Sequence, residues 1–163
     1  MTASKLHIPK SVQTEHKEIH ATLERATQSP GRVGAAAKEL ADVLHPHFVR
    51  EEQIALPPLG LLAPLAAGER LPDSVLSEAL SMSDSLRSEL PRMLEEHNKI
   101  RAAVEKLRSA AQAEKSVKFG QLAEQLALHA QNEEEVLYPA AILVGDLIRA
   151  RPHASGPVGE PAR

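Results

Sequence analysis

"HPHFVREE", residues 45–52, places two histidines around a proline and two glutamates one helical turn later. His47 and Glu51 are four residues apart, so on an α-helix their side chains lie on the same face. Pro46 removes one backbone hydrogen bond and therefore predicts a kink in such a helix. The rest of the chain decides whether the shared face looks toward water or toward the interior of the protein.

The composition indicates a single helical domain. The chain has 163 residues, enough for one domain with a sizeable core. Hydrophobic residues make up 42% but aromatic residues only 2%, and this apolar content, mostly Leu, Ala, Val and Ile, favours helices over sheets. There is no cysteine, which excludes disulfides and thiolate metal sites and leaves His and carboxylates as the strong ligands.

The charge pattern and the apolar runs limit the partners and the location. The net charge is −3 and there is no block of basic residues, which argues against nucleic acid as a partner. Residues 1–10 lack the apolar segment of a signal peptide, and no apolar run reaches the roughly 18 residues of a membrane span. We therefore expect a cytoplasmic protein that has no membrane partner. The sequence leaves its oligomeric state open.

Four segments with a helical pattern of apolar residues organise the chain. The predicted helices cover about residues 9–28, 32–55, 73–113 and 116–150, and Pro91 and Pro139 could interrupt the last two. The segment 56–72 is apolar and rich in Pro and Gly, and we expect it to pack over the helices as an ordered connection. The fold class is therefore all-α, an antiparallel up-down four-helix bundle. It forms one domain over residues 1–150, and residues 151–163 are expected to be a disordered tail.

Each predicted helix has an apolar stripe at steps of three and four residues, and one histidine interrupts each stripe. In the second and fourth helices a glutamate follows four residues after the histidine, and the fourth stripe then continues with Val136 and Ala140. The face that His47 and Glu51 share is therefore the inner face of the bundle. The polar members of the four stripes are His16, His47, Glu51, His97, His129 and Glu133.

Depth along the bundle is an independent test of this placement. The two short turns are centred near residues 31 and 113, and each of the four stripe histidines lies 15 or 16 residues from its turn. At about 1.5 Å per residue, all four lie about 23 Å from the turns, so antiparallel helices bring them into one layer. Glu51 and Glu133 lie one turn beyond this layer, both displaced in the same direction.

Two carboxylates next to this layer need positive charge to compensate them. Glu51 and Glu133 are costly to ionise in a core of Leu and Ala unless they are paired or bound to metal. No Lys or Arg occupies a stripe position near them, and neutral imidazoles cannot cancel two negative charges. Imidazole and carboxylate ligands together suit iron, manganese or zinc. The six polar stripe residues therefore predict a metal centre in the bundle core.

Four motifs at these residues resemble the hemerythrin-like family, which carries the HHE cation-binding domain. They are EHKEI (15–19), HFVREEQIALPPL (47–59), EHNKI (96–100) and HAQNEEEVLYPAA (129–141). The resemblance implies a non-haem di-iron centre in a four-helix bundle, with one iron bound by His16 and His47 and the other by His97 and His129. The two stripe glutamates would bridge the two iron ions, together with an oxo or hydroxo group.

The sequence departs from this family at one position. Hemerythrins usually have a fifth histidine four residues before the third-helix histidine, and here that position is Met93, which is not expected to bind iron. The resemblance therefore implies an under-coordinated iron or a substitute ligand. His20 is the first candidate, because it lies one turn from His16, and Glu96 is the second. The departure weakens the expectation of reversible oxygen carriage more than the expectation of metal binding.

Other polar residues of the motifs are expected outside the ligand set. His45 points away from His47 by about 200° and is expected at the surface. Tyr138 is expected in the core or at its rim, and the sequence gives no support for a role beside the metals. The glutamates next to the ligands are expected to support them from outside or to face solvent; these are Glu52, Glu96, Glu134 and Glu135.

The function implied by the resemblance is to bind, sense or react with oxygen, nitric oxide or peroxide, or to serve iron homeostasis. Oxidase- or peroxidase-like catalysis and non-enzymatic binding are both open. A ferritin-like oxidase is a weak rival, because its Glu-x-x-His pairs are missing: none of the eight histidines has a glutamate three positions before it. The second rival is a structural or interaction bundle with a zinc or another single-metal site.

Overall fold

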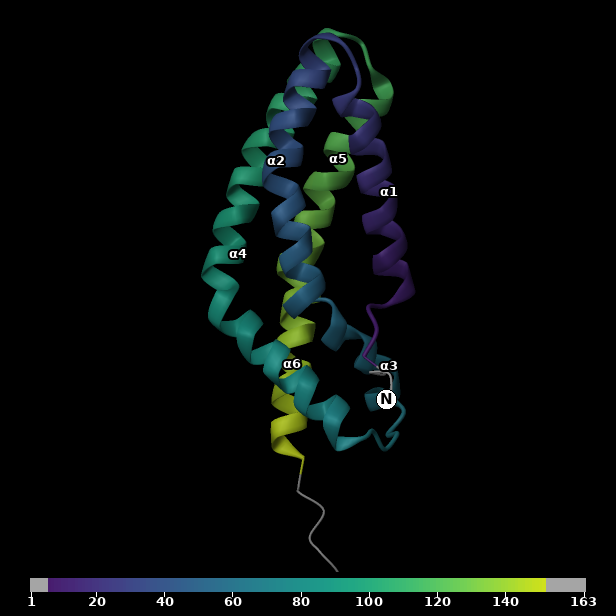
Figure 1. The fold of residues 1–163 in the computed structure, drawn as a ribbon, viewed down its shortest axis with the longest axis vertical. Coiled ribbons are helices and arrows are strands. Elements are labelled where there is room, and N and C mark those ends of the chain that lie inside the picture. The colour runs from purple at the N-terminus through teal and green to yellow at the C-terminus, as the bar shows by residue number, and fades with distance from the viewer. Residues whose placement is uncertain (1–5, 152–163) are drawn as a thin grey trace, which may run out of the picture.

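The computed structural model describes residues 6–151, and every regular element in this range is helical (Figure 1). A π-helical turn, η2, and the helix α6 continue the path of α5 (Figure 1). The predicted all-α class is confirmed. The main helices are α1 (Lys10–Thr27), α2 (Gly31–Ile54), α4 (Asp73–Ala113), α5 (Val117–Asn132) and, after η2 (Glu133–Leu137), α6 (Tyr138–Ala150).

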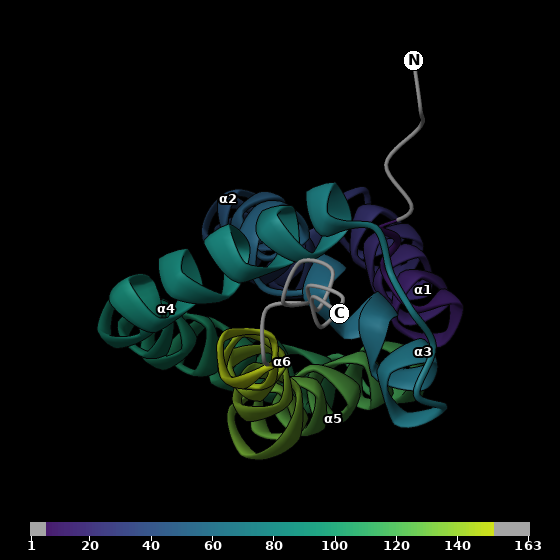
Figure 2. The same cartoon turned by 90° about the horizontal axis from the view of Figure 1, so that it is seen from below.

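The long helices are antiparallel neighbours around one core (Figures 1 and 2). α1 packs against α2 and α5, and α4 packs against α2, α5 and α6. The α1–α2 turn and the α4–α5 turn lie at the same end of the bundle, where the N–H of Arg32 donates a 2.6 Å hydrogen bond to the carboxylate of Glu114. The up-down topology is confirmed. Because both turns lie at the same end, the depth of a residue along its helix can be counted from either turn.

The apolar stripes are buried and form clusters on both sides of the histidine layer. In α1 the residues predicted for the stripe are all buried: Val12, His16, Ile19, Leu23 and Ala26. The cluster toward the turns includes Leu23, Leu40, Leu107 and Leu126. The cluster on the other side of the layer includes Val12, Leu56, Leu86, Met93 and Tyr138. The layer of polar side chains therefore lies between two apolar regions.

Prolines lie inside two helices without ending them. Pro46 lies inside α2 as predicted, and Pro91 lies inside α4, which continues without a break for 41 residues. The expectation that Pro91 could interrupt its helix is therefore wrong. A proline inside a helix removes one backbone hydrogen bond and kinks the axis. α4 bends in its middle, and its N-terminal part crosses the lower end of the bundle (Figure 1).

The fourth predicted helix is not a uniform α-helix. In η2 the N–H of Tyr138 bonds to the carbonyl of Glu133, five residues earlier. Pro139 follows directly and has no N–H with which to continue an α-helical ladder. A π-helical turn accommodates one extra residue, so the inner face changes after it. The stripe predicted after Glu133 is therefore wrong: Val136 is 53% exposed, while Tyr138 and Ala141 are buried.

The connection between α2 and α4 is ordered and packs over the bundle, as predicted. It contains a 3-10 turn, η1 (Pro57–Leu61), and the short helix α3 (Leu62–Ala66). Both views place α3 near the start of α1, at the end of the bundle away from the two turns (Figures 1 and 2). Leu61 and Leu65 are buried there in a third apolar cluster, together with Val144 of α6.

Two further expectations concern the end of the chain and membranes. The predicted disordered tail, residues 151–163, lies outside the described residues except for Arg151. Among residues 6–151, no helix combines the length and the hydropathy that crossing a membrane requires.

Gly145 of α6 lies against α4 and leaves no room for a side chain. A Cβ atom there would lie 2.5 Å from the Cβ of Ser83, whose hydroxyl donates a buried 2.7 Å hydrogen bond to the carbonyl of Ala141. Because the two helices would have to move apart, we expect Gly145→Ala to lower the free energy of unfolding by about 1–3 kcal/mol in urea titrations.

Gly120 of α5 provides a matched control for this substitution. No atom lies within 4 Å of its Cβ position, and the residue is helical. Gly120→Ala should therefore raise the free energy of unfolding by about 0.5–1 kcal/mol. Equal effects of the two substitutions would contradict the close packing of α4 on α6.

Candidate metal centre

Six polar side chains are buried together in the middle of the bundle, and none is more than 3% exposed. α1, α2, α4 and α5 each contribute one histidine, α2 contributes one glutamate and η2 the other. The structure thus brings together all the residues that the sequence predicts as metal ligands: His16, His47, Glu51, His97, His129 and Glu133.

The ligand-type atoms of these residues form two groups, and within each group all atoms lie within 4.8 Å of one another. His16 and His129 form the α1–α5 site with the two glutamates, and His47 and His97 form the α2–α4 site with the same two glutamates. Since both carboxylates belong to both groups, they lie between two adjacent cation-sized sites. This is the placement that bridging ligands require.

The pairing of histidines differs from the one that the family resemblance implied. That pairing joined His16 to His47 and His97 to His129, on helices that are consecutive in the sequence. In the structure the rings of His16 and His129 are 5.0 Å apart, and those of His47 and His97 are 4.7 Å apart. Each helix has two neighbours around the bundle, so equal depth permits either pairing. The directions of the side chains across the α1–α5 and α2–α4 contacts decide it.

The Nε2 atoms of the four histidines point into the two sites. In the α2–α4 site, Nε2 of His47 lies 2.9 Å from Nε2 of His97 and 3.1 Å from Glu51. Nε2 of His97 lies 3.2 Å from Glu133. In the α1–α5 site, Nε2 of His129 lies 2.9 Å from Glu133, and Nε2 of His16 lies 3.7 Å from the same carboxylate. The Nε2 atoms and the carboxylate oxygens therefore converge.

Several of these buried atoms have no hydrogen-bond partner among residues 6–151. They are both ring nitrogens of His16 and of His129, Oε2 of Glu51 and Oε1 of Glu133. The 2.9 Å contact between His129 and Glu133 lacks the alignment of a hydrogen bond. Unpaired polar atoms in an apolar interior cost free energy, and coordination to a cation would satisfy the inward-facing atoms. The donor set therefore fits a metal ion.

Each histidine turns its Nδ1 atom toward a carboxylate outside the two sites. A carboxylate that hydrogen-bonds to Nδ1, as Glu96 does on His47 and Glu134 on His97, fixes the ring and its tautomer, so that the lone pair of Nε2 is free for a metal. Each carboxylate neighbours a ligand in the sequence but supports a histidine on another helix. The four contacts are His47–Glu96 and His97–Glu134 at 2.8 Å, His129–Glu15 at 3.1 Å and His16–Glu52 at 3.7 Å.

The two central carboxylates have opposite pKa shifts. Burial and the charge of Glu133 raise the pKa of Glu51. Burial also opposes ionisation of Glu133, but the close imidazoles of His129, His16 and His97 hold its pKa well below the usual range. Burial lowers the pKa of His129, yet its close contact with Glu133 and the charges of both glutamates raise it to about 9. In the absence of metal, protons on His129 and His47, whose pKa values are both raised, therefore compensate part of the buried negative charge.

Tyr138 lies in the core, one of the two places expected for it, but it also reaches the site, where sequence analysis found no support for a role. It is 1% exposed, and its hydroxyl donates a hydrogen bond to Oε1 of Glu51. The same hydroxyl lies 3.1 Å from Nε2 of His97 and 3.4 Å from Nε2 of His47. Burial and the charges of Glu51 and Glu133 raise its pKa, so the phenol keeps its proton in the metal-free protein. Helical periodicity did not reveal this because the π-helical turn before Pro139 interrupts the stripe pattern.

The two proposed substitutes for the fifth histidine lie elsewhere. His20 belongs to neither ligand group, and its ring contacts those of His45 and Phe48 at 4.9 Å. Glu96 accepts from Nδ1 of His47 and so supports a ligand from outside. His45 is exposed, as expected.

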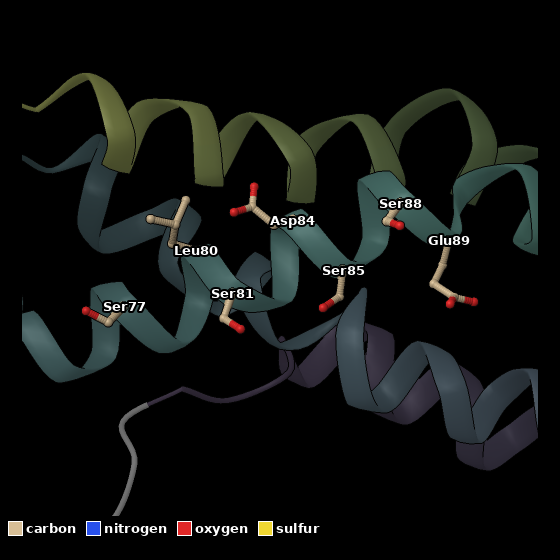
Figure 3. Close-up of a pocket in the computed structure, with 7 residues that line it drawn as sticks. All are labelled: Ser77, Leu80, Ser81, Asp84, Ser85, Ser88 and Glu89. Carbon is tan, nitrogen blue, oxygen red and sulfur yellow. The ribbon is translucent and has the colours of Figure 1, made fainter.

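A surface groove on the N-terminal half of α4 is separate from this centre. Serines line most of it, and Asp84 points from it toward α6, where Arg149 pairs with its carboxylate at 2.8 Å (Figure 3). None of the six buried residues of the metal centre lines this groove.

The shared carboxylates should matter more for metal binding than the histidines beside the centre. Glu51→Ala or Glu133→Ala removes a ligand from both groups, so each should lose most of the bound metal. His20→Ala and His45→Ala are the controls and should retain it. Metal content per chain after loading and gel filtration measures the effect, and similar losses in all four variants would disprove the bridging assignment.

The metal-free protein should lose stability as the pH rises from 6.5 to about 9, the interval between the ordinary and the raised pKa of His129. A raised pKa stabilises the folded state below the ordinary value and ceases to do so above the raised one. The pKa values of His47 and Glu51 are raised as well. The lowered pKa of Glu133 affects stability only at acidic pH. Over the same interval metal affinity should increase, because ligands bind metal in their deprotonated form. Melting temperatures of the metal-free protein that do not change with pH would contradict this.

Comparison with known families agrees with the geometry. The family described as Hemerythrin HHE cation binding domain matches residues 7–141, and a second match covers residues 88–158. Comparisons with curated proteins and with solved structures give no significant match. The first match includes all six buried residues of the two sites and most of the chain. The chain therefore belongs to the hemerythrin HHE cation-binding family.

Proposed function

We propose that the protein binds two iron ions per chain, bridged by Glu51 and Glu133, and uses them to bind, sense or react with a small molecule such as oxygen, nitric oxide or peroxide. The observation that carries the proposal is that both glutamates belong to both ligand groups. Two shared carboxylates suit two adjacent cations, whereas a single zinc would need only one of the groups. Four imidazoles with two carboxylates, and no sulfur ligand, suit iron.

The surroundings of the centre support a small, uncharged ligand. Apolar clusters enclose the layer on both sides, and Phe48 stacks on the ring of His16 at 4.1 Å. These residues hold the imidazoles in place and exclude bulk water. When bound, a di-iron centre supplies electrons and an exchangeable coordination position. The chain supplies the fixed ligand geometry, the dry pocket and the outer carboxylates.

The proposal includes enzymatic and non-enzymatic use of such a centre, and a role in iron homeostasis. A cytoplasmic location, and the lack of nucleic-acid or membrane partners, stay predictions from the sequence. An oxo or hydroxo bridge between the irons is part of the proposal because the family implies it.

Metal analysis with spectroscopy tests the proposed function. Protein expressed in iron-rich medium should contain close to two iron ions per chain. Azide should then change the near-ultraviolet and visible spectrum of the ferric form, because a small anion can occupy the exchangeable position. The metal-loaded form should also melt at a higher temperature than the metal-free form. One zinc ion per chain, with no iron uptake on reconstitution, would favour the single-metal alternative.

A further inference from the structure

Tyr138 places a phenol inside the α2–α4 site. Its hydroxyl lies 3.1 Å from Nε2 of His97 and 3.4 Å from Nε2 of His47, and it donates to Glu51. We propose that Tyr138 is a metal ligand: its phenolate oxygen binds the iron held by His47 and His97. This rests on the proposed function, since it requires a metal in that site.

The position of the hydroxyl distinguishes this role from support of a ligand from outside. Supporting groups in this protein contact Nδ1, and on His47 and His97 that atom already bonds to Glu96 and Glu134, respectively. The hydroxyl of Tyr138 instead faces the Nε2 atoms, which point toward the metal. Its three polar neighbours are all groups that belong to the α2–α4 site.

The backbone brings Tyr138 to this place. On a regular α-helix, five residues would turn Tyr138 about 140° away from Glu133. The π-helical turn changes this register, and Tyr138 is buried while Val136 is exposed. π-helical turns inside α-helices are frequent at functional sites. The turn therefore accounts for a ligand that is five residues from another ligand.

The other half of the centre offers an internal comparison. After Glu51, as after Glu133, the residue five positions later bonds its N–H to the glutamate carbonyl and precedes a proline. In the first half that residue is Leu56, fully buried in the same apolar cluster as Tyr138. A phenol is therefore present on one side of the centre and absent from the other.

Coordination chemistry supports the assignment. His47, His97 and the two glutamates supply four ligands, and the phenolate supplies a fifth, while Met93 packs in the same apolar cluster as the tyrosine. Phenolate is a hard anionic ligand, found on iron in other proteins. On binding, the O–H bond breaks, an oxygen–iron bond forms and the proton leaves to solvent; no electron is transferred. The α1–α5 site has no such fifth ligand among the described residues, so the exchangeable position belongs to that iron.

Spectroscopy of the ferric protein tests this assignment directly, because the chain has one tyrosine and no tryptophan. Ferric wild-type protein should show a tyrosinate-to-iron charge-transfer band in the visible region, with tyrosinate modes in its resonance Raman spectrum. Tyr138→Phe should lose both completely and should bind two azide ions per chain instead of one. The double variant Tyr138→Phe/Phe119→Tyr is the control: it has one tyrosine, away from the layer, and should also lack the band.

The outcomes separate this inference from the proposed function. Two irons per chain in the wild type without tyrosinate modes would overturn the ligand assignment and leave the di-iron proposal intact. A wild-type protein that takes up no metal would overturn both. Because the wild-type spectrum alone is decisive, the test does not depend on whether Tyr138→Phe folds.

Discussion

The negative charge of Glu51 and Glu133 is the constraint on which the rest of this structure depends. Both carboxylates are almost completely buried between the helices, and no Lys or Arg among the described residues contacts them. Ionised carboxylates persist in such an interior only beside compensating charge. The four histidines answer this need in two ways. His129 and His47, whose pKa values are raised, take up protons when metal is absent, and all four histidines would provide nitrogen ligands to a bound metal.

The outer carboxylates connect this centre to the fold. Glu15 and His16 are adjacent in α1, yet Glu15 faces His129 of α5. Glu96 precedes His97 in α4 and supports His47 of α2. Each short polar motif therefore places at least one side chain in the centre and directs a carboxylate toward a histidine on another helix. The side chains of each site, and the carboxylates that contact them, come from several helices. Metal ions in the two sites would therefore connect all four helices, which explains why metal binding is expected to stabilise the fold.

The two halves of the centre are related in sequence but unequal in chemistry. Both contain H-x-x-x-E-E followed by a proline, and in both the backbone N–H five residues after the first glutamate bonds to the carbonyl of that glutamate. The residue at that point is Leu56 in one half and Tyr138 in the other. An apolar side chain fills space beside the layer, whereas a phenol adds a polar atom to it. Two irons in such a centre would differ in their ligands and therefore in their reactivity.

The sequence by itself determined the four helices, their inner faces as far as Glu133, the common depth of the four histidines and the place of the two glutamates one turn beyond them. Helical periodicity and distance from a turn are properties of each segment alone, so His16, His47, His97 and His129 could be placed before any contact was known. The tertiary structure decided which histidines face each other, because every helix in the bundle has two neighbours at equal depth. It also decided the role of Tyr138. A π-helical turn shifts the inner face by one residue, and that backbone choice depends on packing against the other helices as well as on Pro139.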